Sequence, residues 1–393
     1  MIMKNWIIKY WIKLLKTVRY YITENINIDL NHIMYSTNIK YKLTDALINY
    51  THYYNDNNVL NDQVSEDWKQ WLVGFTDGEG SFRINIRNDD TRAELNFTIK
   101  LHVDDQSVLQ DILNKLDVTM VNIHFQSDED TCSISIGDRD ILLNKVIPLF
   151  DKYPLLTKKR YDYMLWREAF FLNIDKSLVK TEKMNKIIQL KAKLNKYAKE
   201  DLSLYPNIEN ITPYMNMNWI VGFIEGEGSF TIKSQKDSLH LNISQHVYSS
   251  PAMQAILNHF LSLTPDINCP IKTNINNISN KLYPDKNKMR VMTTTVDFHY
   301  WILIPNLLKT NFYTRKRIDF ILWAILVILK KHGILITPEG QRFLNEVKAC
   351  HNSKRYFKAN PIPNIKSIIN MLNITPFYDV TKTHDHNSRN YKL

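Results

Sequence analysis

One twelve-residue phrase occurs twice in this chain of 393 residues. Residues 71–82 read WLVGFTDGEGSF and residues 219–230 read WIVGFIEGEGSF, with nine of the twelve positions identical. Each copy begins as an apolar helix and ends in an acid between two glycines. A repeat at this spacing predicts two equivalent halves in one chain, related by a pseudo-twofold axis.

A second phrase is repeated further along each half. Residues 157–166 read TKKRYDYMLW and residues 314–323 read TRKRIDFILW. The acids of the first phrase, Glu79 and Glu227, are 148 residues apart, whereas Lys159 and Lys316 of the second are 157 apart. The two halves therefore differ by nine residues, a difference that loops can absorb.

Strands and helices alternate between these phrases. Runs in which apolar and polar residues alternate predict strands, and longer runs with apolar residues three or four apart predict helices. The order in each half is αββαββα, so we predict an α+β fold of two tandem units with antiparallel sheets. The elements predicted after the opening helices are 82–87, 95–101, 104–116, 119–126, 131–136 and 138–150, then 230–235, 239–244, 249–262, 270–276, 289–296 and 297–308.

The predicted elements divide the chain into five parts. Five basic residues precede the first acid, Glu24, which suits a membrane-surface helix or a transit peptide. Lysines recur too often there for a membrane span, and Ser and Arg are too few for a transit peptide. We therefore interpret the segment as a non-catalytic extension and expect no obligatory membrane partner. The parts are an N-terminal extension (1–64), a first unit (65–196), a linker (197–217), a second unit (218–355) and a C-terminal tail (356–393).

Charge and composition favour a polyanionic partner. Lys and Arg number 50 against 40 Asp and Glu, which gives a formal net charge of +10 and a pI of about 9.2. Cys132, Cys269 and Cys350 lack the spacing of a zinc site or a disulfide framework, which indicates a reducing compartment. Because AT-rich codons encode the abundant Asn, Ile, Lys and Tyr, we expect the gene to lie in an AT-rich genome such as an organellar one.

The two repeated helices are predicted to begin after the caps Ser65 and Asn218 and to pack side by side. Glycine inside a helix costs about 1 kcal/mol relative to alanine, a cost that is understandable where two backbones approach closely. Such packing brings Glu79 and Glu227 together, and two close carboxylates repel unless a cation lies between them. Mg²⁺ takes oxygen ligands, so the pair is a candidate metal site for phosphodiester hydrolysis. The glycines, four residues apart in each helix, are Gly74 and Gly78, and Gly222 and Gly226.

The nonapeptides LVGFTDGEG and IVGFIEGEG resemble the motif of the LAGLIDADG family of homing endonucleases and intron maturases, in its single-chain form with two repeats. The resemblance covers about residues 68–355. It implies two αββαββα halves whose antiparallel sheets form a DNA-binding saddle. The metal-binding acid of the family is the eighth residue of the motif, which matches Glu79 and Glu227, where aspartate is common.

Four further residues follow from the two phrases. Asp77 and Glu225 precede the paired acids by two positions and point elsewhere on a helix, so we predict a structural, capping role across the interface. In relatives with a similar second phrase a lysine from each half reaches the active site, and Lys159 and Lys316 match it by position. Such a cation can stabilise the transition state or poise water, whereas a simple phosphate contact is the alternative.

The polar faces of the two hairpins are the predicted DNA readers. A β-ribbon fits the major groove, where Arg, Asn and Gln pair with base edges. A solvated sheet face is the alternative, but the mixture of amides and hydroxyls with cations favours base readout. Because the two faces differ, we expect a long, asymmetric target. The predicted readers are Arg83, Asn85, Arg87, Asn96, Thr98 and Lys100 in the first unit, and Thr231, Lys233, Gln235, His240, Asn242 and Ser244 in the second.

Two functions follow from these features. The first is an intron-encoded, Mg²⁺-dependent endonuclease that cuts both strands of a DNA site and acts as a monomer. The alternative is a maturase that binds and stabilises a group I intron RNA, with or without DNA cleavage. The paired acids favour the endonuclease, since RNA binding alone does not require them.

Overall fold

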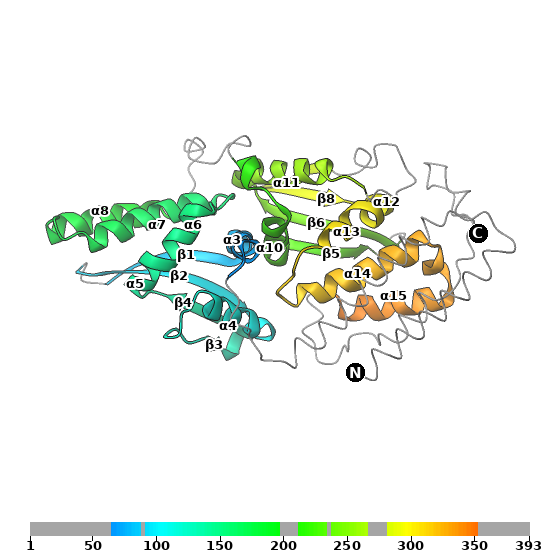
Figure 1. Cartoon of the computed structure of the whole chain (residues 1–393), viewed down its shortest axis with the longest axis horizontal. Coiled ribbons are helices and arrows are strands. Elements are labelled where there is room, and N and C mark those ends of the chain that lie inside the picture. Colours follow the sequence, from blue (N-terminus) through cyan, green and yellow to red (C-terminus); the bar gives the residue numbers. More distant parts are fainter. Residues whose placement is uncertain (1–63, 88–90, 197–210, 234–236, 266–280, 353–393) are drawn as a thin grey trace.

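The computed structural model describes residues 64–87, 91–196, 211–233, 237–265 and 281–352 (Figure 1). These residues form two units with the same order of elements, which meet at a central pair of helices. The predicted N-terminal extension and C-terminal tail, most of the linker, Gln235 and the strand predicted at 270–276 lie outside the described residues. The exact boundaries of the five parts stay a prediction.

The central helices are α3 (Glu66–Glu79) and α10 (Met217–Glu227). As predicted, Ser65 caps α3, and its hydroxyl accepts a hydrogen bond from the backbone N–H of Trp68 at 3.2 Å. The second helix begins earlier than expected, because Asn216 caps it through the N–H of Trp219 at 3.0 Å. Asn218, which we would have expected as the cap, is instead inside α10, and its amide donates across the interface to Asp67 at 2.8 Å.

Each unit contains a four-stranded antiparallel sheet that starts directly after its central helix. The strand orders are β1-β2-β4-β3 and β5-β6-β8-β7, so the two sheets have the same topology. The short strand β3 begins five residues later than predicted, and β8 ends three residues earlier. The strands are β1 (Gly80–Ile86), β2 (Ala93–His102), β3 (His124–Gln126), β4 (Thr131–Ile136), β5 (Gly228–Lys233), β6 (Ser238–His246), β7 (Lys281–Asp285) and β8 (Lys288–Thr293).

The remaining helices follow the same twofold arrangement. In Figure 1, the pair α7 and α8 and the pair α14 and α15 lie at opposite ends of the molecule. Helix α14 is buried from Ile318 to Leu329, yet among the described residues no helix is long and apolar enough to cross a membrane. The longer of these helices are α4 (Gln106–Lys115), α7 (Lys159–Ile174), α8 (Lys180–Lys193), α11 (Ser250–Ser262), α14 (Lys316–Lys331) and α15 (Pro338–Cys350).

Both units also contain a π-helical segment that the sequence pattern does not reveal. Residues Leu142–Val146 and His299–Leu303 each interrupt the helix predicted near 138–150 or 297–308. In each case a proline, Pro148 or Pro305, follows two residues after the segment. Proline has no N–H for the bond to the residue four positions before it, so a wider turn there satisfies the backbone with less strain.

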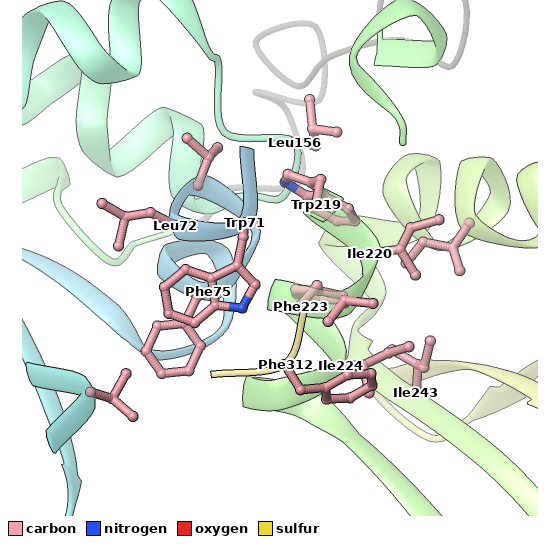
Figure 2. Close-up of a cluster of buried hydrophobic side chains, with 14 of the residues drawn as sticks. Trp71, Leu72, Phe75, Leu156, Trp219, Ile220, Phe223, Ile224, Ile243 and Phe312 are labelled. Carbon is pink, nitrogen blue, oxygen red and sulfur yellow. The ribbon is translucent and has the colours of Figure 1, made fainter. Parts of the chain in front are cut away.

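The core of the interface is aromatic. Trp71 and Phe75 of α3 stack with ring centroids 5.0 Å apart, and Trp219 and Phe223 of α10 stack at 4.9 Å. All four side chains are buried and lie along the two crossing helices in Figure 2. The two units therefore share one hydrophobic core, and the helices that form it end at the candidate site.

Candidate active site

The glycines allow the central helices to touch backbone to backbone. A methyl group on Gly74 would lie 2.0 Å from the carbonyl oxygen of Trp219, and one on Gly222 would lie 2.1 Å from that of Trp71. One turn later, a methyl group on Gly78 would lie 3.0 Å from the Cα of Gly226. The predicted close approach is confirmed, and it continues to the ends of both helices.

The approach brings the paired acids together. Glu79 and Glu227 are the last residues of α3 and α10, and each is followed by the first strand of its sheet. The Cγ of each acid is within 3.4–3.6 Å of the position of a methyl group on the opposing glycine. Burial, and then the charge of Glu227, raises the pKa of Glu79 to about 7. Burial also raises the pKa of Glu227.

A lysine from each unit lies at the same crossing. The ammonium of Lys159 donates to the carbonyl oxygens of Thr76 and Gly78, each at 2.9 Å, at the C-terminal end of α3. The ammonium of Lys316 donates to the carbonyl of Gly228 at 2.6 Å. Burial lowers the pKa of Lys159, but nearby carboxylates oppose that shift. Cations at helix C-termini are favourable, and here they also face the paired acids.

Asp77 and Glu225 cap the segments that lead into α7 and α14. Asp77 accepts hydrogen bonds from the N–H groups of Leu156 and Thr157 at 2.8 and 3.1 Å, and Glu225 accepts one from that of Thr314 at 2.6 Å. The predicted capping role is present in both units, with aspartate in one and glutamate in the other.

Each of these capping acids also accepts a hydrogen bond from the opposite unit. The indole N–H of Trp219 donates to Asp77 at 3.0 Å, and that of Trp71 donates to Glu225 at 2.5 Å. Since Lys159 and Lys316 are the first residues of α7 and α14, these contacts position the lysines as well.

The chemistry of the crossing suits Mg²⁺. The described residues contain no cluster of three or more His, Cys, Asp or Glu side chains that could hold a metal. Mg²⁺ does not require one, because it commonly keeps several waters and binds one or two carboxylates together with substrate phosphates. Glu79 and Glu227 are such a pair, and a cation between them would relieve their repulsion.

The predicted readers separate into accessible and buried side chains. Two of them, Thr98 and His240, are only 5% and 8% exposed, and Thr98 bonds to the hydroxyl of Ser135 instead. These two cannot reach a base edge in this conformation, so we remove them from the predicted interface. The accessible readers, exposed or half-buried, are Arg83, Asn85, Arg87, Asn96, Lys100, Thr231, Lys233, Asn242 and Ser244.

The sheets also bring together residues that the sequence analysis did not select. On β4, Ser133 pairs with Lys100, and on β8, Arg290 pairs with Ser244 and Lys288 with His246. The alternation within TCSISI and KMRVMT indicates a polar face on each of these strands. The sequence did not show that the strands pair with β2 and β6. Gln245 was also missed, and its amide donates to Glu227 at 3.1 Å.

Two crossing helices that present paired carboxylates between two antiparallel sheets define a pseudo-symmetric, two-repeat class of protein. The family model described as LAGLIDADG endonuclease matches residues 72–170 and 220–327, which together are more than half of the chain. The chain belongs to this LAGLIDADG family, and the resemblance in its motifs is confirmed.

Relatives and solved structures agree with this assignment. The chain is 31% identical over 350 residues to the uncharacterised mitochondrial protein RF1 of Saccharomyces cerevisiae, which covers 85% of this chain and 70% of that protein. It is 30% identical to the probable intron-encoded endonuclease Cox1-I1b of Schizosaccharomyces pombe, over 65% of this chain and 62% of that one.

Among solved structures, the homing endonuclease I-LtrWI bound to target DNA matches with a TM-score of 0.60 and 22% identity, over 74% of this chain and 99% of that one. The meganuclease I-AabMI bound to uncleaved DNA matches with a TM-score of 0.57 and 26% identity, over 72% and 99%. These likenesses confirm the predicted fold of two tandem units with antiparallel sheets.

Proposed function

We propose that this chain is an intron-encoded endonuclease that binds one double-stranded DNA site and hydrolyses a phosphodiester bond in each strand. The observation that carries the proposal is the meeting of Glu79 and Glu227 at the ends of two helices whose backbones touch. That position is costly for two carboxylates without a cation, since burial and mutual repulsion both oppose their ionisation.

Each group at the crossing has a role in this proposal. Glu79 and Glu227 would hold Mg²⁺, which would polarise the phosphate and favour ionisation of a water nucleophile. Lys159 and Lys316 place positive charge beside the acids, where negative charge develops on the phosphate. Asp77 and Glu225 keep both lysines in place through the caps of α7 and α14.

The two sheets supply the surface for DNA. Arg83, Asn85 and Arg87 of β1 and its end are exposed, and Lys233 is exposed on β5. Side chains of this kind read base edges from a β-ribbon in the major groove. Because one chain contains both halves, we propose that it acts as a monomer. The names of relatives from yeast mitochondria and from introns support a mitochondrial location.

The test is cleavage of a DNA duplex that carries the joined exon junction of the host gene, in the presence of Mg²⁺. Glu79→Gln and Glu227→Gln should each reduce double-strand cleavage by about 10²–10³-fold, while binding of the duplex in Ca²⁺ stays within about twofold. Glu66→Gln is the matched control, because this acid lies in the first turn of α3 and is exposed.

Two results would overturn the proposal. Full double-strand cleavage by either single variant would show that the paired acids are not the catalytic centre. Tight binding of the intron RNA by a wild-type preparation that cuts no DNA at any exon junction would replace the endonuclease by an RNA-binding function.

A further inference from the structure

One residue at the outer end of the second hairpin is held by three side chains of the helical layer. Asp237 lies directly before β6, at the end of the β5–β6 hairpin that is farther from the central helices. Its Oδ1 accepts a hydrogen bond from the ammonium of Lys348 at 2.9 Å, and its Oδ2 accepts one from the amide of Gln341 at 3.4 Å. Its backbone carbonyl accepts one from the ammonium of Lys330 at 2.8 Å. Lys330 is in the last turn of α14, and the other two donors are on α15, so both helices reach the same residue of the hairpin.

The backbone of Asp237 is shaped for this contact. Its φ of 45° lies in the left-handed region, which aspartate adopts more readily than most residues. The ladder between β5 and β6 ends with the pair of Lys233 and Ser238, so the carbonyl of Asp237 is available to the ammonium of Lys330. Burial lowers the pKa of Lys330, and the charge of Asp237 opposes that shift. The chain therefore leaves the strand conformation at the point where the helical layer binds it.

The first hairpin has no carboxylate at this position. The strand registers place Ala93 at the position of Asp237, and Ala93 still pairs with Ile86 in the ladder. Its carbonyl accepts a long hydrogen bond, of 3.5 Å, from the amide of Asn173, which the spacing of the repeated phrases places at the position of Lys330. The first hairpin thus continues as a regular ladder where the second is bound to its helices.

Helix α8 of the first unit shows that the helix pair itself does not need these polar contacts. Lys191 is at the position of Lys348, is exposed, and forms no ion pair with an acid among the described residues. Met184 is at the position of Gln341 and is buried. An apolar core residue and a solvated lysine are therefore sufficient for packing here, so we assign the contacts of the second unit to the hairpin.

We propose that Asp237 is a positioning residue for DNA recognition, whose contacts with α14 and α15 fix the outer end of the second hairpin so that the bases read there are strictly specified. This inference rests on the proposed function. A recognition side chain must be held within about 0.5 Å of its productive position, which requires a rigid support. The nearest accessible reader is Lys233, and its partner in the ladder, Ser238, directly follows Asp237. The anchor therefore acts on this reader through a single strand pair.

The first measurement is the base preference at each position of the DNA site, from sequencing of the duplexes that the protein selects out of a randomised library in Ca²⁺. Lys348→Met removes the donor to Asp237 and keeps most of the length of the side chain. It should reduce discrimination between bases by about fivefold or more at the outer positions of one half-site and leave the other positions unchanged. Affinity for the preferred duplex should stay within about threefold, because phosphate contacts dominate it. Lys191→Met is the matched control, since it removes the same charge at the equivalent position of the first unit, and its preferences should equal those of the wild type.

The second measurement asks whether the two charged groups act through one contact. Asp237→Asn suits the same left-handed backbone but removes the charge that attracts Lys348. The double variant should relax the base preferences no further than the more affected single variant, because both substitutions break the same ion pair. Lys348→Arg keeps a charged donor and should restore the preferences of the wild type. Additive effects of the two substitutions, or equal relaxation at every position with a lowered melting midpoint, would overturn the inference and leave Asp237 a purely structural role.

The two proposals can fail separately. A wild-type protein that selects specific duplexes but cuts none of them refutes the proposed endonuclease, and the base preferences of the variants still decide the role of Asp237. A wild-type protein that cuts its preferred duplex, beside a Lys348→Met variant with unchanged preferences, refutes only the inference about Asp237. A wild-type protein that selects no sequence refutes both.

Discussion

Replacing Gly74 by alanine would place a methyl carbon 2.0 Å from the carbonyl oxygen of Trp219, in the facing helix. An ordinary contact begins at about 3.4 Å, so the helices would have to separate locally by more than about 1 Å. Neither atom belongs to a side chain that can rotate away. The substitution therefore tests whether the close approach of α3 and α10 holds the two units together.

The magnitude follows from two opposing effects. Alanine gains about 1 kcal/mol over glycine within a helix, which favours the variant. Against this, a gap of 0.5–1 Å loses about a quarter to a half of the dispersion energy of each contact that it opens. The stacked rings of Trp71, Phe75, Trp219 and Phe223 lie along this interface. We expect a net loss of at least about 3 kcal/mol in the free energy of unfolding, which is at or above the upper end of the usual cost of overpacking a core.

Denaturation followed by circular dichroism measures this loss. Gly78→Ala is the graded control, because its methyl group would lie 3.0 Å from the Cα of Gly226, a contact that small shifts can relieve. Gly74→Ala should lower the melting midpoint by at least about 5 °C, and Gly78→Ala by clearly less. A Gly74→Ala protein that is as stable as wild type, or more stable than Gly78→Ala, would refute backbone contact at this crossing.

Three further predictions concern stability, pH and metal. Trp71→Phe removes the indole donor to the buried Glu225 and should cost about 1.5–3 kcal/mol in urea denaturation. Burial lowers the pKa of His299 to about 3. As the pH falls, the imidazole is therefore protonated at a higher pH in the unfolded chain than in the folded protein, so the free energy of unfolding should decrease from about pH 6.5 toward pH 3. By pH 4.5 the free energy of unfolding should have decreased by about 2–3 kcal/mol because of this group. Denaturation of the His299→Gln variant at pH 7 and at pH 4.5 should show a decrease that is smaller by this amount. EDTA should abolish cleavage in a plasmid assay and leave the melting midpoint unchanged within about 1 °C.

The sequence was sufficient for the architecture because its signals are local and repeated. The alternation of Phe82 and Ile84 with Arg83 and Asn85 predicts strand β1, and the structure buries the first pair and exposes the second. The start of β3 was predicted too early, because the strand begins only at His124. A three-residue edge strand depends on its pairing with β4, which the local pattern does not contain. The π-helical segments depend on a proline and its neighbours together, which periodicity alone does not record.

For the site, the sequence predicted which groups meet but not how they are held. Glu79, Glu227, Lys159 and Lys316 are all at the crossing, as the paired phrases indicate. The donor to Glu227 was missed, because Gln245 reaches the acid only through the register of β5 with β6. An alternating pattern identifies the exposed face of a strand, and it cannot tell which residue of that face stands beside a group on another element.

The reciprocal contacts of Asp77 and Glu225 join the two halves at the candidate site. Each acid is on the central helix of its own unit and caps the segment before its own lysine, yet it accepts an indole N–H from the other unit. Separation of the helices would break both indole bonds and leave two buried carboxylates less satisfied, which is costly in a low-dielectric interior. The contact between the two helices that brings Glu79 to Glu227 therefore also fixes the positions of Lys159 and Lys316. A change that separates the helices should displace the acids and the lysines together.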